Sequence, residues 1–145
     1  EQLPWWQIVA APTLGGVIIG LLVKVLMPEG RPEGVADVIE AGALRGGRMS
    51  GLIGLKAALI NACSIGFGAS VGREGPAVHF GAALGGWLAS TLHLTRSVSR
   101  TLLGCGAAAA VAASFNAPIA GALFASEVVI GHYALSAFAP IVIAA

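Results

Sequence analysis

Residues 57–95 read AALINACSIGFGASVGREGPAVHFGAALGGWLASTLHLT, and they place one Arg-Glu pair between two apolar runs. Neither run, 57–72 or 75–95, contains Asp, Glu, Lys or Arg. A helix that crosses a bilayer needs about 20 apolar residues, each adding about 1.5 Å along the axis. The stretch therefore predicts two membrane helices that meet at a break carrying Arg73 and Glu74.

The rest of the chain has the same character. Of its 145 residues, 57% are hydrophobic and only 10% are charged, which is too few for the surface of a soluble domain of this size. Further runs without a charged side chain cover residues 5–23, 101–126 and 128–145. The sequence thus predicts an all-α, polytopic membrane protein, organised as one membrane unit over residues 1–145 and forming part of a longer protein.

Proline, glycine and charge divide this unit into segments. A first helix is expected over about 3–27, followed by a polar connection over 28–48 that contains a short helix after Gly34. Membrane helices are expected over about 50–145, in the segments 50–69, 77–92, 101–113, 117–131 and from about 134 onward.

Composition argues against the common soluble functions. The net charge of +1 provides no basic face for nucleic acid. Cys63 and Cys105 lie in separate apolar runs, where packing explains them better than a metal site or a redox pair. Ser70 has no neighbouring His, and the three histidines are not at ligand spacing. We therefore expect no enzyme activity, no metal, no cofactor and no nucleic-acid partner.

Glycine is abundant and regularly placed. There are 21 glycines, and pairs such as Gly16 with Gly20 and Gly81 with Gly85 are four residues apart. This spacing lets two helix backbones approach closely in lipid, so we expect most of these glycines to serve helix packing.

The charged break carries the chemistry. At the bilayer centre a charged side chain costs about 2.5–3.5 kcal/mol, and intramembrane charges usually have a function. Gly72 permits a tight break, and Pro76 suits the first turn of the next helix because an N–H there would be unpaired. The break would expose backbone N–H groups at a helix N-terminus, which stabilises an anion by about 0.3–2 kcal/mol.

Glu74 lies among these donors. Its carboxylate could occupy the anion site when ionised and leave it when protonated or displaced, which would make Glu74 a gate. Alternatively, Glu74 only caps its helix or pairs with Arg73. The chemistry of the residues leaves both interpretations open.

The motif Gly72-Arg73-Glu74-Gly75-Pro76 resembles the signature of CLC chloride channels and chloride/proton exchangers, and the following AVHFG resembles its usual continuation. The later stretch 104–127, with GAAA, FNAP and GALF before Glu127, resembles the helices that follow in this family. The resemblance covers roughly residues 28–145. The first helix is similar to the family only in its general character and not in its motifs.

The resemblance implies a CLC-type fold with broken and tilted helices, of which this chain is one of two inverted halves. It also implies a homodimer, with residues 117–130 at the dimer interface. In the family, the glutamate matching Glu74 is the external gate, and the amides matching Arg73, Glu74 and Gly75 surround the outer anion site. Other anion-binding elements of the family are absent here, so this segment alone is not expected to conduct.

The first anion loop departs from the family pattern. The usual Gly-Ser-Gly-Ile-Pro is replaced by Pro32-Glu33-Gly34-Val35-Ala36, which is followed by Asp37. Glu33 stands where the serine hydroxyl would help to bind the central anion, and a carboxylate there repels an anion unless it is protonated or turned away. The backbone amides of Gly34 and Val35 are still expected to contribute, but the choice among anions is left open.

A second departure concerns proton coupling. Many exchangers carry two consecutive glutamates at the position where this chain has Glu127 followed by Val128. Valine is typical of the channel members, so it favours channel-like conduction slightly over chloride/proton exchange. The alternative function is a structural or assembly subunit of a membrane complex, without transport activity.

The expected partners follow from this interpretation. They are chloride or a similar small anion, protons if exchange occurs, the lipid bilayer and a second copy of the chain. The compact loops favour a bacterial inner (plasma) membrane. His79 is expected to pack or to form a hydrogen bond. Because both of the loops near Arg45 and Arg96 are basic, charge alone does not decide the orientation in the membrane.

Overall fold

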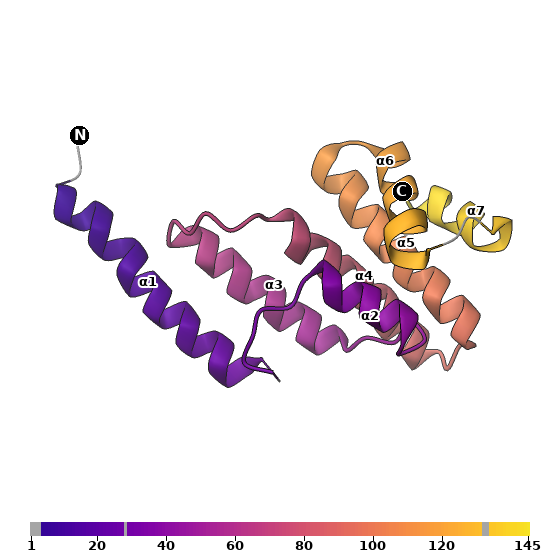
Figure 1. Ribbon diagram of the computed structural model, residues 1–145, viewed down its shortest axis with the longest axis horizontal. Helices are drawn as coiled ribbons and strands as arrows, with labels where there is room; N and C mark the ends of the chain where they lie inside the picture. The colour runs from indigo at the N-terminus through magenta and orange to yellow at the C-terminus, as the bar shows by residue number, and fades with distance from the viewer. Residues whose placement is uncertain (1–3, 28, 132–133) are drawn as a thin grey trace.

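The computed structural model describes residues 4–27, 29–131 and 134–145. In this part of the chain every regular element is helical, which confirms the all-α prediction (Figure 1). The elements are α1 (Trp5–Leu26), α2 (Val35–Ala43), α3 (Gly51–Gly66), α4 (Glu74–Thr91), α5 (Arg96–Phe115), α6 (Pro118–Phe124), the π-helical segment η1 (Ala125–Ile130) and α7 (Leu135–Ala144).

Two helices are long and apolar enough to cross a membrane by themselves. They are α1, with 22 residues, and α5, with 20 residues. Three shorter apolar stretches accompany them, at Gly51–Gly66, Pro118–Ile130 and Leu135–Ala144. By length and composition, the described part of the chain thus combines two long apolar helices with shorter apolar ones.

Local signals in the sequence account for several helix ends. Pro4 immediately precedes α1, and the Ser50 hydroxyl accepts a hydrogen bond from the Ile53 N–H at the start of α3. Asn116 ends α5 in the left-handed conformation, with φ of 52°, a backbone geometry that asparagine tolerates well. Pro118 then takes the first position of α6.

Some predicted helix boundaries differ from the observed ones. The helix predicted to begin near residue 101 begins at Arg96, because charged residues are tolerated in an exposed first turn. The helix predicted to begin near residue 77 begins at Glu74, since Pro76 fits within the first turn. The preceding helix ends at Gly66 and not near residue 69.

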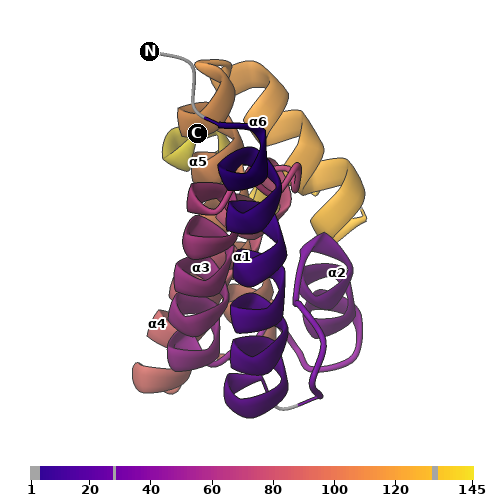
Figure 2. The same cartoon turned by 90° about the vertical axis from the view of Figure 1, so that its left-hand side faces the viewer.

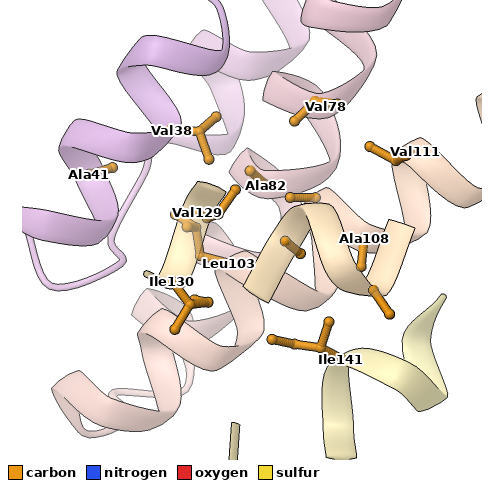
Figure 3. Packing of buried hydrophobic residues seen from close by; sticks show 13 residues of the cluster. Val38, Ala41, Val78, Ala82, Leu103, Ala108, Val111, Val129, Ile130 and Ile141 are labelled. Atoms are coloured by element: carbon orange, nitrogen blue, oxygen red, sulfur yellow. The ribbon is translucent and has the colours of Figure 1, made fainter. Parts of the chain in front are cut away.

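The helices α4 and α5 pack closely through glycine. A Cβ placed on Gly81 would collide with the backbone oxygen of Gly106, and a Cβ on Gly85 would collide with that of Leu102. The prediction that Gly81 and Gly85 serve close packing is therefore confirmed. Around this contact lies a core built from α2, α4, α5, α6, η1 and α7, whose buried side chains Figure 3 shows.

The helix α1 lies at the edge of the molecule, beside α3 (Figures 1 and 2). Gly15 is its close contact, because a Cβ there would collide with the Phe67 side chain. An added Cβ on Gly16 or Gly20 would meet no atom of the described residues within 4 Å, so neither glycine packs against this part of the chain. The outer face of α1 is apolar and exposed, with Ile8, Val9, Leu14, Val17, Leu21 and Val25 uncovered.

Candidate functional site

The break between α3 and α4 forms as the residue types predict. The chain leaves α3 after Gly66 and turns at Gly68, whose φ of 87° favours glycine. It then runs without regular structure to Arg73, the residue preceding α4. Glu74 is thereby placed in the first turn of an 18-residue helix.

Glu74 has only a weak contact with its neighbour. The Nε atom of Arg73 and the Oε1 atom of Glu74 are 4.0 Å apart, and their side chains are 76% and 46% exposed. An exposed ion pair at this distance contributes little, about 0–1 kcal/mol. Arg73, the N-cap residue of α4, makes no side-chain capping hydrogen bond among the described residues. The pairing of Glu74 with Arg73 therefore has weak geometric support, whereas the first-turn position of Glu74 fits an acidic residue that stabilises a helix N-terminus.

The N-terminus of α4 presents unused donors. Within the described residues, the first hydrogen bond from the backbone of α4 runs from the Ala77 N–H to the Arg73 oxygen, at 3.1 Å. The N–H groups of Glu74 and Gly75 have no acceptor in that part of the chain. A Cβ on Gly75 would meet no atom of the described residues within 4 Å. The two donors are therefore unpaired within that part of the chain, as an anion site at a helix N-terminus requires.

The second predicted loop leads into α2. The Gly34 N–H donates to the Asp37 Oδ2 atom at 2.7 Å, so this predicted anion donor is bound within the chain. The Val35 N–H has no acceptor among the described residues. Arg31 donates to the other Asp37 oxygen at 2.7 Å. Burial raises the pKa of Asp37, but the bonds from Arg31 and Gly34 outweigh burial and hold this pKa below its ordinary value.

Glu33, the residue in the serine position, is turned toward α4. Its Oε2 atom lies 2.8 Å from the Nε2 atom of His79, which is completely buried, while the Glu33 side chain is 19% exposed. Within the described residues, neither ring nitrogen of His79 has an aligned hydrogen bond. The two atoms are thus in close contact without the angle of a well-formed hydrogen bond, and the contact is an ion pair only when His79 is protonated.

Sequence reasoning missed this pair. His79 lies inside an apolar helix, where packing or a hydrogen bond is the expected role, and Glu33 lies 46 positions earlier in a loop. No periodic pattern connects two residues in such different elements. The available signal is the acidic residue at the usual serine position, because a partly buried carboxylate is stabilised by a polar partner.

Two cavities adjoin Glu33. The larger, of about 180 Å³, has mainly apolar walls from α1 and α3 and extends from Glu33 to Pro76 at the break. The smaller, of about 110 Å³, extends from Glu33 to Arg45 and is also lined by the carboxylates of Glu29 and Asp37. Glu33 therefore lies between the Glu74 break and the basic loop of residues 44–50.

The remaining predicted residues lie outside this region. Glu127 is in the first turn of η1, followed by the partly exposed Val128. Cys63 is exposed on α3, and Cys105 is half-buried on α5. Among the described residues, no three His, Cys, Asp or Glu side chains gather as a metal site would require. His132 lies outside the described residues.

Known proteins resemble the whole chain. A family model described as voltage gated chloride channel matches residues 15–145. A ClcB-like chloride channel protein of Ralstonia nicotianae is 37% identical over 149 residues, covering 100% of this chain and 35% of that protein. The voltage-gated ClC-type chloride channel ClcB of Yersinia pseudotuberculosis is 32% identical, covering 97% of this chain and 34% of that protein. ClcB of Escherichia coli gives the same values.

The chain spans about a third of the length of the curated relatives it matches. No solved structure matches it.

Proposed function

Since the chain belongs to the voltage-gated chloride channel family, we propose that the protein moves chloride or a similar small anion across a membrane and that Glu74 gates the path. The family assignment itself confirms the resemblance first drawn from residues 72–76. The role of Glu74, the mechanism of transport and the partners are proposals.

One observation supports the gate above all others. Glu74 lies in the first turn of α4, and the N–H groups of Glu74 and Gly75 have no acceptor among the described residues. A free anion and the carboxylate would compete for these donors, because both are stabilised at a helix N-terminus. When Glu74 is protonated it no longer competes as an anion.

The proposal assigns transport and not catalysis to the protein. Channel-like conduction is slightly favoured over chloride/proton exchange, because Val128 replaces a second glutamate. We further propose a homodimer in a bacterial inner membrane. The exposed apolar face of α1 suits contact with lipid or with the rest of a larger membrane domain.

The test is chloride efflux from liposomes that contain the full-length protein, with the external pH recorded at the same time. We expect Glu74→Ala to alter the efflux and to make it less dependent on pH, because the competing carboxylate is gone. Glu40→Ala is the matched control, since this glutamate pairs with Arg45 on an exposed surface and should leave the efflux unchanged.

The outcomes separate the mechanisms. Efflux without proton movement supports a gated channel. Efflux coupled to uphill proton movement, with the coupling lost in Glu74→Ala, supports an exchanger and contradicts the argument from Val128. Absence of anion flux from the wild type under every condition contradicts the transport proposal and favours an assembly subunit.

A further inference from the structure

We propose that the protein binds the phosphate group of an anionic lipid where the loop of residues 44–50 meets the start of α5. The site consists of two adjoining pockets that share Arg96, the first residue of α5. It lies at the C-terminal end of α4, away from the break that carries Glu74, and its occupation does not depend on the role of Glu74.

Four arginines line the two pockets. The first pocket, of about 290 Å³, contains Arg45, Arg48 and Arg96. The second, of about 280 Å³, contains Arg96 and Arg100. The N–H groups of Arg96 and Ser97, at the N-terminus of the 20-residue helix α5, have no acceptor among the described residues. Side chains and backbone thus present donors for the same anion.

Two glycines with positive φ bring the loop and the helix together. Gly46 and Gly47 have φ of 66° and 80°, which favours glycine. A Cβ on Gly46 would collide with the Arg96 side chain, and one on Gly47 would collide with the backbone of Ser99 and Arg100. The loop therefore wraps closely around the first turn of α5 and fixes the stem of Arg96 between the two pockets.

The guanidinium groups are held in place but are not neutralised. Glu40 pairs with Arg45 at 2.7 Å, whereas no carboxylate of the described residues lies within ion-pair distance of Arg48, Arg96 or Arg100. The Nε atom of Arg100 is buried and has no acceptor in this part of the chain. Each guanidinium carries five N–H donors in a planar fork that fits the oxygens of a phosphate. These donors are therefore available to an anion from outside the chain.

Apolar side chains beside the arginines favour a lipid over a free phosphate ion. Leu44 lines the first pocket and is 74% exposed, and Leu135, which precedes Ser136 on the wall of the second pocket, is 79% exposed. A phosphate ion covers no apolar surface, whereas the acyl chains of a lipid do. Since α5 is long and apolar enough to cross a membrane, its first turn lies at the depth of the lipid headgroups.

The test measures lipid binding to the full-length protein in detergent by native mass spectrometry, with phosphatidylglycerol as the probe and zwitterionic phosphatidylcholine for comparison. We expect phosphatidylglycerol to bind about tenfold more tightly, and Arg48→Gln or Arg96→Gln to remove about this factor, because each loses a charge-assisted contact. Arg31→Gln is the matched control. It removes the same charge from an arginine that Glu29 and Asp37 already neutralise, and should keep the wild-type affinity.

Arg48→Gln separates lipid binding from folding. Arg48 is exposed, so without added lipid this variant should unfold at the wild-type temperature, even if Arg96→Gln disturbs the loop. Wild-type affinity in both variants overturns the proposal. So does an equal loss of affinity in Arg31→Gln, or the absence of any preference for phosphatidylglycerol, because either result means that charge attracts the lipid without a defined site.

Leu44→Gln and inorganic phosphate distinguish the two sources of phosphate. We expect Leu44→Gln to weaken the binding of phosphatidylglycerol, and this lipid to raise the temperature of thermal unfolding more than inorganic phosphate does. If inorganic phosphate protects the protein equally well and Leu44→Gln has no effect, the pockets bind a free phosphate ion and the lipid proposal is overturned.

Discussion

At the scale of single residues, the contacts within this chain do not explain why position 75 is a glycine. It lies in the first turn of α4 without a positive φ, and a Cβ there would meet nothing within 4 Å. Neither backbone conformation nor packing within this chain therefore requires glycine. The proposed anion site supplies a reason, because a small residue lets an anion approach the amides of Glu74 and Gly75.

We therefore expect Gly75→Ala to reduce anion binding without reducing stability. Alanine is a better helix former than glycine by about 0.5–1 kcal/mol, so thermal unfolding should occur at the same or a higher temperature. A weakened hydrogen bond to an anion costs about 1.5–3 kcal/mol, so chloride affinity should fall about tenfold or more. Calorimetric chloride titration and thermal unfolding measure the two effects. Unchanged affinity together with lower stability would show that this glycine serves packing.

At the scale of elements, the pairing of α4 with α5 depends on the absence of side chains. Gly81 and Gly106 face each other so closely that a Cβ on either one would collide with the backbone oxygen of the other. On the same helix lie the buried core residues Val78 and Ala82 (Figure 3). This helix also carries His79 and Glu74. The position of the candidate site is thus coupled to the α4/α5 contact.

We expect Gly81→Ala to destabilise the protein by about 1–3 kcal/mol, because the two helices must separate to admit the methyl group. Thermal unfolding in detergent measures the loss. Gly16→Ala makes the same change on α1, where an added Cβ meets no atom of the described residues within 4 Å, and should cause no loss. Equal effects of the two substitutions would contradict the packing argument.

At the scale of the whole molecule, the fold gathers basic residues at one end. Arg96 donates to the Ala43 oxygen and Arg100 to the Ile130 oxygen, both at 3.4 Å. A Cβ on Gly47 would collide with the backbone of Ser99 and Arg100. The two basic loops thus lie together, at the end of α4 opposite Glu74. Basic loops favour the cytoplasmic side, so we expect this end inside and the Glu74 break open to the outside.

Accessibility of introduced cysteines measures this orientation. In a variant with Cys63→Ser and Cys105→Ala, we expect Arg48→Cys to react with a membrane-impermeant thiol reagent only after the cells are opened. Ser70→Cys, in the loop before the Glu74 break, should react in intact cells. The reverse pattern would contradict the orientation and would place the gate on the cytoplasmic side.

Much of the site could be predicted from the sequence because the signals are local. The Gly72-to-Pro76 motif specifies a helix start through residues that are neighbours in the chain, and α4 begins within it. The outer donors at Glu74 and Gly75 follow from that start alone. The role of the Gly34 amide was harder to predict. This amide was expected to bind an anion, but it donates to the Asp37 carboxylate, whose direction depends on the local turn.

The sequence by itself determined the membrane class, the helical fold and the break at Glu74, because hydrophobicity and helix signals act over a few residues. Only the tertiary structure decided that Glu33 meets His79 and that the two basic loops share one end. Both depend on how α4 packs against α2 and α5, through contacts between residues far apart in the chain. Such contacts depend on how the helices pack in three dimensions. The periodicity of a sequence predicts single helices and not the contacts between them.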